Sequence, residues 1–184
     1  MTKNKHKIFL IGLMGSGKTT IGKIVAKKLQ LTFMDSDVLI EEKTGVKVPL
    51  IFEYEGEEGF RKREASTLTD LAIKNDMVLA TGGGIVLLAE NRKLLVESGW
   101  VFYLKAHTDE LARRLANDKS RPLLQQVDVK EKLNEPRVAK LFVETQQHFG
   151  PHRRLRAVLV LVPTTRAVGK VALCRLGLEA LDDI

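Results

Sequence analysis

Short apolar runs alternate with longer segments of helical periodicity along the chain. The apolar runs predict strands over residues 7–11, 31–34, 77–80, 101–104 and 157–162. The periodic segments predict helices over residues 18–29, 36–43, 48–54, 57–74, 89–98, 108–117, 129–149 and 166–181. Strands that alternate with helices form parallel sheets joined by crossover helices. We therefore expect an α/β fold, a three-layer α/β/α sandwich with a five-stranded parallel sheet, whose ligands bind beyond the carboxyl ends of the strands.

The length and composition of the chain suit one compact domain spanning residues 1–184. Hydrophobic residues make up 44% and charged residues 29% of the 184 positions, which is ordinary for a globular protein. No apolar run approaches the roughly 20 residues that span a bilayer, and no signal peptide precedes the first predicted strand. The single cysteine, Cys174, cannot form an internal disulfide. These features predict a cytoplasmic protein without a membrane partner.

The formal net charge of +7 indicates anionic partners. Nucleic acid and small anionic substrates both need cationic binding residues. Aromatic residues make up only 5% of the chain, and it contains no known RNA- or DNA-reading motif. We therefore expect small anionic substrates and no nucleic acid.

The clearest chemical motif is G-x-x-x-x-G-K-T at residues 12–19, between the first predicted strand and the first predicted helix. Its glycines let backbone N–H groups turn inward and cradle polyphosphate oxygens. Lys18 adds a mobile positive charge for the β- and γ-phosphates, and the Thr19 hydroxyl can ligate Mg²⁺. The residues assigned to nucleotide binding here are Gly12, Gly15, Ser16, Gly17, Lys18, Thr19 and Thr20. The motif thus predicts a phosphate loop.

Two carboxylates flank a serine after the second predicted strand, in the order Asp35-Ser36-Asp37. One carboxylate there can hold Mg²⁺ through water, and the other can accept or orient a substrate hydroxyl for attack on a γ-phosphate. Helix capping is the alternative explanation, because Asp and Ser are preferred N-cap residues. Two acids exceed what one cap needs, so we favour a functional role for at least one of them.

Two further segments carry candidate binding residues. Arg61 lies in a charged helix start, where Glu57 and Glu58 precede Arg61 and Lys62 by four residues. That spacing fits weak ion pairs on a solvated face as well as it fits a guanidinium that grips a carboxylate. The glycine run 82–84 follows the third predicted strand. Consecutive glycines suit a close approach of main chain to a ligand, with a tight turn as the alternative.

A polar stretch over residues about 116–130 has the composition of a lid. Arg114 and Arg121 bracket it. An arginine delivered by a closing lid can stabilise the charge of a transferring phosphoryl group. Ordinary surface arginines are the alternative reading.

Together these segments resemble the shikimate kinases from residue 7 to about residue 124. The resemblance rests on residues 12–19, Asp35-Ser36-Asp37, Gly56-Glu57-Glu58-Gly59-Phe60-Arg61, Thr81-Gly82-Gly83-Gly84 and Arg121-Pro122-Leu123-Leu124. It implies a P-loop NTPase fold of the nucleoside monophosphate kinase type, with acceptor-binding helices over about 36–75. It also implies ATP-dependent phosphorylation of the 3-hydroxyl of shikimate, with Mg²⁺, for aromatic amino acid biosynthesis.

The resemblance also implies a role for each matching residue. Asp37 contacts the shikimate hydroxyls and assists as the base, Asp35 supports Mg²⁺ together with Thr19, and Arg61 grips the shikimate carboxylate. The glycines Gly82, Gly83 and Gly84 pack against the acceptor. Arg121 touches the phosphoryl group, and Arg114 stacks near adenine. The catalytic residues are then Asp37, Lys18 and Arg121, and the partners are ATP and shikimate, bound to a monomer.

The resemblance weakens after Leu124. The family has a second carboxylate-binding arginine ahead of its last strand, and the nearest counterpart here is Arg137, five residues before Phe142. Either Arg137 takes this role with a one-residue offset, or Arg153 or Arg154 replaces it, or acceptor binding is weakened. Two other functions stay open: a kinase of another small hydroxy acid, of the gluconate type, and a nucleotide-binding P-loop module with impaired catalysis.

Overall fold

The computed structural model describes residues 6–116, 155–160 and 172–173. Their strands form one sheet in the order β2-β3-β1-β4-β5-β6. The strands are β1 (Lys7–Ile11), β2 (Thr32–Asp35), β3 (Met77–Ala80), β4 (Trp100–Lys105), β5 (Leu155–Val160) and β6 (Ala172–Leu173). The first five run parallel to their neighbours, and β6 pairs antiparallel with β5. The predicted five parallel strands are therefore confirmed, with small shifts of their bounds.

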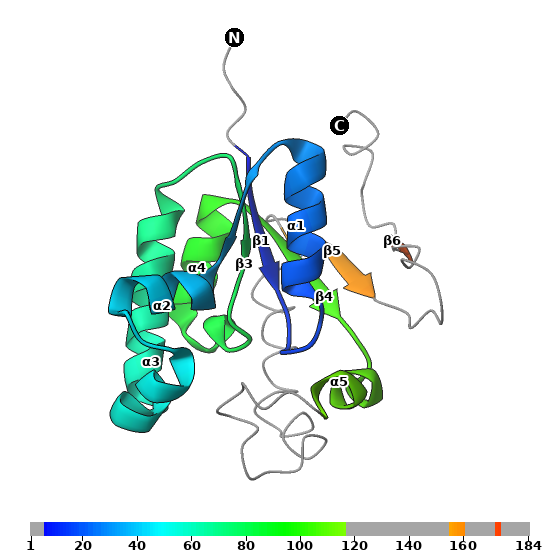
Figure 1. Cartoon of the computed structure of the whole chain (residues 1–184). Helices are drawn as coiled ribbons and strands as arrows, with labels where there is room; N and C mark the ends of the chain where they lie inside the picture. Colours follow the sequence, from blue (N-terminus) through cyan, green and yellow to red (C-terminus); the bar gives the residue numbers. More distant parts are fainter. Residues whose placement is uncertain (1–5, 117–154, 161–171, 174–184) are drawn as a thin grey trace.

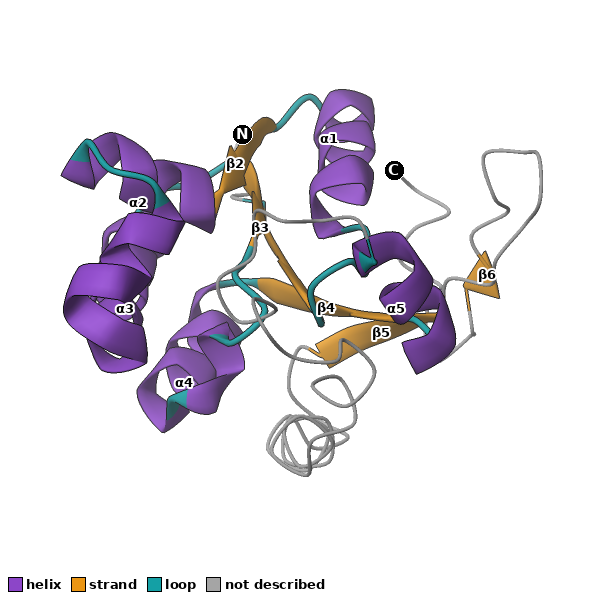
Figure 2. Cartoon of the chain, turned by 60° about the horizontal axis from the view of Figure 1, so that its bottom comes forward, coloured by secondary structure: helices purple, strands orange, loops and turns teal. Residues whose placement is uncertain are grey.

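Helices cover both faces of the sheet (Figures 1 and 2). The helices are α1 (Lys18–Leu29), α2 (Ser36–Thr44), α3 (Val48–Ala72), the 3₁₀ turn η1 (Ile85–Leu87), α4 (Ala89–Ser98) and α5 (Thr108–Leu115). Alternate residues of β1 face opposite layers. Phe9 packs with Leu68 of α3 and Leu95 of α4, whereas Leu10 packs with Ala26 of α1. This alternation makes the predicted three-layer sandwich.

Helix α3 bends at Gly56, where φ is 68° and ψ is −175°. A left-handed φ of this kind is easy only for glycine. The two helices predicted over 48–54 and 57–74 therefore follow one another directly, separated by this residue. Helix α2 and the parts of α3 on both sides of this bend form a small core of their own around Ile40, Ile51 and Phe60.

The C-terminal part of the sheet differs from expectation. A helix predicted over 166–181 is wrong at Ala172–Leu173, which form β6. A short apolar run fits a strand as well as a helix, and pairing with the open edge of β5 decides the outcome. The predicted helix over 129–149 and Cys174 lie outside the described residues.

No helix in the described part of the chain is long and apolar enough to cross a membrane. The carboxyl ends of the parallel strands lie at the bottom of Figure 1, where the loop after β1, the start of α2 and helix α5 come together. Strand β1 lies between β3 and β4. After β1 the chain crosses to β2 on one side, and after β3 it crosses past β1 to β4 on the other side, so the connections after β1 and β3 diverge. Open parallel sheets bind ligands at the carboxyl ends of the strands, in the crevice where the connections diverge in this way.

Candidate active site

The loop between β1 and α1 takes its shape from glycines with left-handed or extended positive φ. The φ angles of Gly12, Gly15 and Gly17 are 146°, 76° and 91°. A side chain at Gly12 would approach the carbonyl oxygen of Leu104 to 2.5 Å. Gly17 also begins α1 without a side-chain cap, which leaves the first N–H groups of the helix available to an anion.

Lys18 is nearly buried and folds back over this loop. Its Nζ donates hydrogen bonds to the carbonyl oxygens of Gly12 at 2.7 Å and Leu13 at 2.8 Å. Ser16 beneath it is fully buried. The ammonium group of Lys18 therefore lies against the phosphate loop, where the sequence motif predicts a positive charge.

Asp35 at the end of β2 and the first two residues of α2, Ser36 and Asp37, join the phosphate loop to the glycine run. Oδ2 of Asp35 accepts a hydrogen bond of 2.9 Å from the Thr19 hydroxyl, and Oδ1 accepts one of 3.1 Å from the backbone N–H of Asp37. Asp35 is thus the N-cap of α2 as well as a neighbour of the phosphate loop. Ser36 is buried, and its hydroxyl accepts a hydrogen bond of 2.8 Å from the N–H of Gly82. The hydrogen bond of Ser36 thus ties the start of α2 to the glycine run.

Arg61 is 9% exposed and lies between two carboxylates of its own helix. Nη1 donates to Oε2 of Glu64 at 2.8 Å, and both Nε and Nη2 donate to Oε1 of Glu57, at 3.4 Å and 3.2 Å. These bonds use three of the five N–H groups of the guanidinium. No partner among the described residues takes the other two, one on each Nη, and these are left for an anionic ligand such as a carboxylate.

Glu64 is a residue of this site that the sequence analysis missed. Its side chain is fully buried, and its Oε1 has no hydrogen-bond partner among the described residues. Burial raises the pKa of this carboxyl to about 7, although the nearby Arg61 lowers it in part. In the sequence, the only sign of Glu64's role is its position three residues after Arg61. That face of α3 points to the interior only because the ends of neighbouring strands lie against it.

The glycine run gives these side chains room. A Cβ at Gly84 would collide with the guanidinium of Arg61, and one at Gly82 would collide with Oε1 of Glu64. Neither residue has a positive φ. Close approach, rather than a tight turn, is therefore what requires glycine at these two positions.

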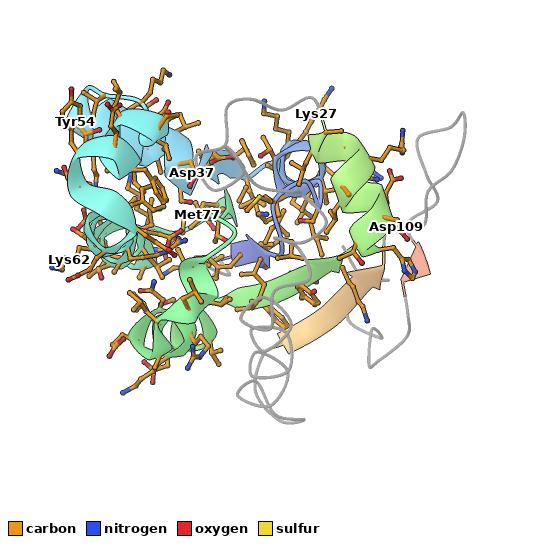
Figure 3. All side chains as sticks on the ribbon, turned by 90° about the horizontal axis from the view of Figure 1, so that it is seen from below. Lys27, Asp37, Tyr54, Lys62, Met77 and Asp109 are labelled. Atoms are coloured by element: carbon orange, nitrogen blue, oxygen red, sulfur yellow. The ribbon has the colours of Figure 1, made fainter. Side chains whose placement is uncertain are left out.

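Two cavities meet at the carboxyl ends of the strands. The phosphate-loop cavity, of about 540 Å³, is lined by the loop, the first turn of α1 and Arg114. The α2–α3 cavity, of about 510 Å³, is lined by Arg61, the glycine run, Lys47 and apolar side chains of α3. The residues that line both are Met14, Asp35, Asp37 and Gly83. Figure 3, seen from below, shows Asp37 between the α2–α3 pair and α1.

The apolar wall of the α2–α3 cavity includes Val48, Phe52 and Phe60, which the sequence analysis did not single out. The rings of Phe52 and Phe60 lie 4.7 Å apart between centroids. The signal in the sequence is the apolar run 48–52 at the start of α3, in which Val48 and Phe52 are four residues apart and so share one helix face. Of the other predicted site residues, Thr20 lines the phosphate-loop cavity, while Arg121, Arg137, Arg153, Arg154 and most of the 116–130 segment lie outside the described residues.

The chain is similar to known proteins of one family. The model of the family described as shikimate kinase matches residues 14–154. A shikimate kinase of Dechloromonas aromatica is 50% identical over 133 residues, which are 72% of this chain and 73% of that protein. One of Methylococcus capsulatus is 47% identical over 155 residues, 79% of this chain and 87% of that protein.

Solved structures give the same result. The shikimate kinase of Acinetobacter baumannii in complex with shikimate superposes with a TM-score of 0.74 at 37% identity, covering 90% of this chain and 87% of that one. A gluconokinase of Sinorhizobium meliloti is similar with a TM-score of 0.51 at 14% identity, covering 87% and 85%. The second likeness shows a shared fold only.

Proposed function

The chain belongs to the shikimate kinase family, and from this membership we propose how its two cavities divide the substrates. The activity is that of an ATP-dependent shikimate kinase in the shikimate pathway of aromatic amino acid biosynthesis. ATP occupies the phosphate-loop cavity and shikimate the α2–α3 cavity. The transferred phosphoryl group crosses at Asp35 and Asp37, which line both.

The phosphate-loop cavity has the groups that a triphosphate needs. The loop N–H groups and the start of α1 offer donors to the phosphates. Lys18 is held over the loop by two carbonyl oxygens, and it exchanges these contacts for the β- and γ-phosphates. Arg114 lines the same cavity, where its guanidinium stacks near the adenine.

Thr19 and Asp35 fit a magnesium site. Their side-chain oxygens lie 2.9 Å apart at the entrance to the phosphate loop, and hard oxygen donors are what Mg²⁺ prefers. The described residues contain no group of three or more acidic, His or Cys side chains that could cage a metal. Mg²⁺ usually completes its shell with waters and substrate phosphates, and when bound it neutralises phosphate charge.

Arg61 and the glycine run anchor the acceptor. The two remaining N–H groups of the guanidinium bind the shikimate carboxylate, and the apolar wall of Phe52 and Phe60 packs against the carbocyclic ring. Asp37, whose backbone N–H donates to the Asp35 cap at the start of α2, then directs its carboxylate to the 3-hydroxyl. Asp37 orients that hydroxyl toward the γ-phosphate and accepts its proton.

Positioning and electrostatics supply most of the rate enhancement in such a transfer. The resemblance to the family assigns phosphoryl contact to Arg121 on the 116–130 lid, and the second carboxylate anchor to Arg137, with Arg153 or Arg154 as substitutes. These four lie outside the described residues, so their roles stay predictions. We also propose that the single domain acts as a monomer, which light scattering after size-exclusion chromatography would test.

The observation that carries the division of substrates is that Asp37 lines both cavities. The test is a coupled assay of ADP release with and without shikimate, and with gluconate in its place. We expect turnover that depends on shikimate and is absent in Lys18→Ala. ATP binding without shikimate-dependent turnover would instead indicate a nucleotide-binding module, and turnover with gluconate alone a kinase of another acceptor.

A further inference from the structure

Helix α5 packs directly on the phosphate loop. Leu111 and Leu115 are buried against Leu13 of the loop, and a side chain at Gly15 would meet Leu115 at 3.1 Å. A polar contact joins the same two elements, because Nη1 of Arg114 donates a hydrogen bond of 3.1 Å to the carbonyl oxygen of Gly15, 99 residues away in the chain. The position of Arg114 is therefore tied to the shape of the loop.

A carboxylate in the first turn of α5 holds the other side of this arginine. Oε1 of Glu110 accepts hydrogen bonds from Nε of Arg114 at 2.7 Å and from Nη2 of Arg113 at 2.8 Å, while Oε2 accepts one of 3.0 Å from Nε of Arg113. The Glu110 side chain is only 9% exposed. The hydrogen bonds from Arg113 and Arg114 lower the pKa of Glu110 to about 2, so it is charged at neutral pH.

The two arginines on Glu110 lie in different surroundings. The side chain of Arg113 is 75% exposed, whereas that of Arg114 is 32% exposed and lines the phosphate-loop cavity. An ion pair between residues three or four apart on an exposed helix contributes little by itself. What distinguishes Arg114 is that Glu110 and Gly15 together fix both ends of its guanidinium beside a cavity.

We propose that Glu110 is a positioning residue for nucleotide binding, which holds Arg114 against the phosphate loop in the conformation that meets the nucleotide. The inference rests on the proposed function, in which ATP occupies the phosphate-loop cavity. A long side chain loses conformational freedom when a ligand fixes it. Because Glu110 has already fixed Arg114, bound ATP does not bear that entropic cost.

The test compares Glu110→Gln with Arg113→Ala in the full-length protein. Gln keeps the size of the side chain but removes the charge, and Arg113 shares the same carboxylate without reaching the loop. We expect Glu110→Gln to raise the Kd for ATP, measured by calorimetry without shikimate, about three- to tenfold. The KM for shikimate should change by less than about twofold, and Arg113→Ala should leave both constants within the same limit.

A double-mutant cycle then decides whether Glu110 acts through its partner. In the Arg114→Ala background, Glu110→Gln should have no further effect on the Kd for ATP. The proposal would be overturned if Glu110→Gln weakened ATP binding as much in the Arg114→Ala background as in the wild type, or if it left the Kd for ATP unchanged. It would also be overturned if Glu110→Gln raised the Kd for ATP and the KM for shikimate together and lowered the Tm. Because ATP binding is measured alone, wild-type protein that binds ATP but does not phosphorylate shikimate would contradict the proposed function and leave this inference intact.

Discussion

Arg61 and Glu64 form a buried ion pair, with Nη1 and Oε2 2.8 Å apart and the carboxylate fully shielded from solvent. Glu64 places the guanidinium at the edge of the α2–α3 cavity. Burial destabilises its charged form, because its second oxygen has no hydrogen-bond partner among the described residues. A carboxyl that is buried in this way resists ionisation even beside a cation.

The raised pKa of Glu64 predicts a pH-dependent stability. Its pKa rises from an ordinary 4.5 to about 7 in the folded protein, so between these values the folded state holds a proton that the unfolded chain has lost. The free energy of unfolding should therefore fall as pH rises through this range, by roughly 3 kcal/mol at most. Urea unfolding at a series of pH values measures this slope.

Two variants of α3 separate Glu64 from the other carboxylates. Glu64→Gln should remove the slope, because it has no proton to release. Glu58→Gln should retain it, since Glu58 is exposed and pairs with Lys62. Identical pH profiles for the wild type and Glu64→Gln would show that folding does not raise the pKa of Glu64.

Arg61→Ala should weaken shikimate binding and spare ATP. Loss of a charge-assisted hydrogen bond is worth about 1.5–3 kcal/mol, so the Kd for shikimate should rise by about 10- to 150-fold. Titration calorimetry with each substrate measures the two effects separately. Arg63→Ala is the matched control, because Arg63 pairs with Glu55 on the outer side of the same helix. Shikimate affinity that survives Arg61→Ala would refute the anchor role.

Gly84→Ala should reduce shikimate affinity through Arg61. The φ of Gly84 is −102°, which alanine adopts freely, so the cost comes from the collision of Cβ with the guanidinium. We expect the KM for shikimate to rise on the order of tenfold, as when one charge-assisted hydrogen bond is displaced. In an Arg61→Ala background the same substitution should have no further effect, and an additive loss there would point to the backbone instead.

Thr19→Val should raise the Mg²⁺ requirement. Valine keeps the shape of the side chain but removes the hydroxyl that donates to Asp35. The Mg²⁺ concentration for half-maximal activity should rise by at least about tenfold. Thr69→Val is the control, because Thr69 lies on the exposed side of α3 and its hydroxyl donates to the carbonyl oxygen of Ala65 in the same helix. A wild-type Mg²⁺ curve for Thr19→Val would remove Thr19 from the metal site.

Several elements of the site were predictable because their function depends on local chain geometry. The phosphate loop needs glycines, Lys18 and Thr19 at fixed spacing between a strand and a helix, and that spacing is visible in the sequence. Glu64 was not predictable in the same way. On the helix it looks like one more charge among Glu57, Glu58 and Lys62, and it becomes a buried partner only because the glycine run of another element approaches it.

By itself the sequence determined the order of strands and helices, the phosphate loop and the residues that mark the family, since periodicity and motif spacing are properties of neighbouring residues. Only the tertiary structure decided that Asp37 lies between two cavities, that Arg61 turns inward onto Glu64, and that α5 carries Glu110 and Arg114 to the phosphate loop. It also decided that Ala172–Leu173 pair with β5 rather than form a helix. Each of these outcomes depends on contacts between segments far apart in the chain, where burial and pairing outweigh local preference.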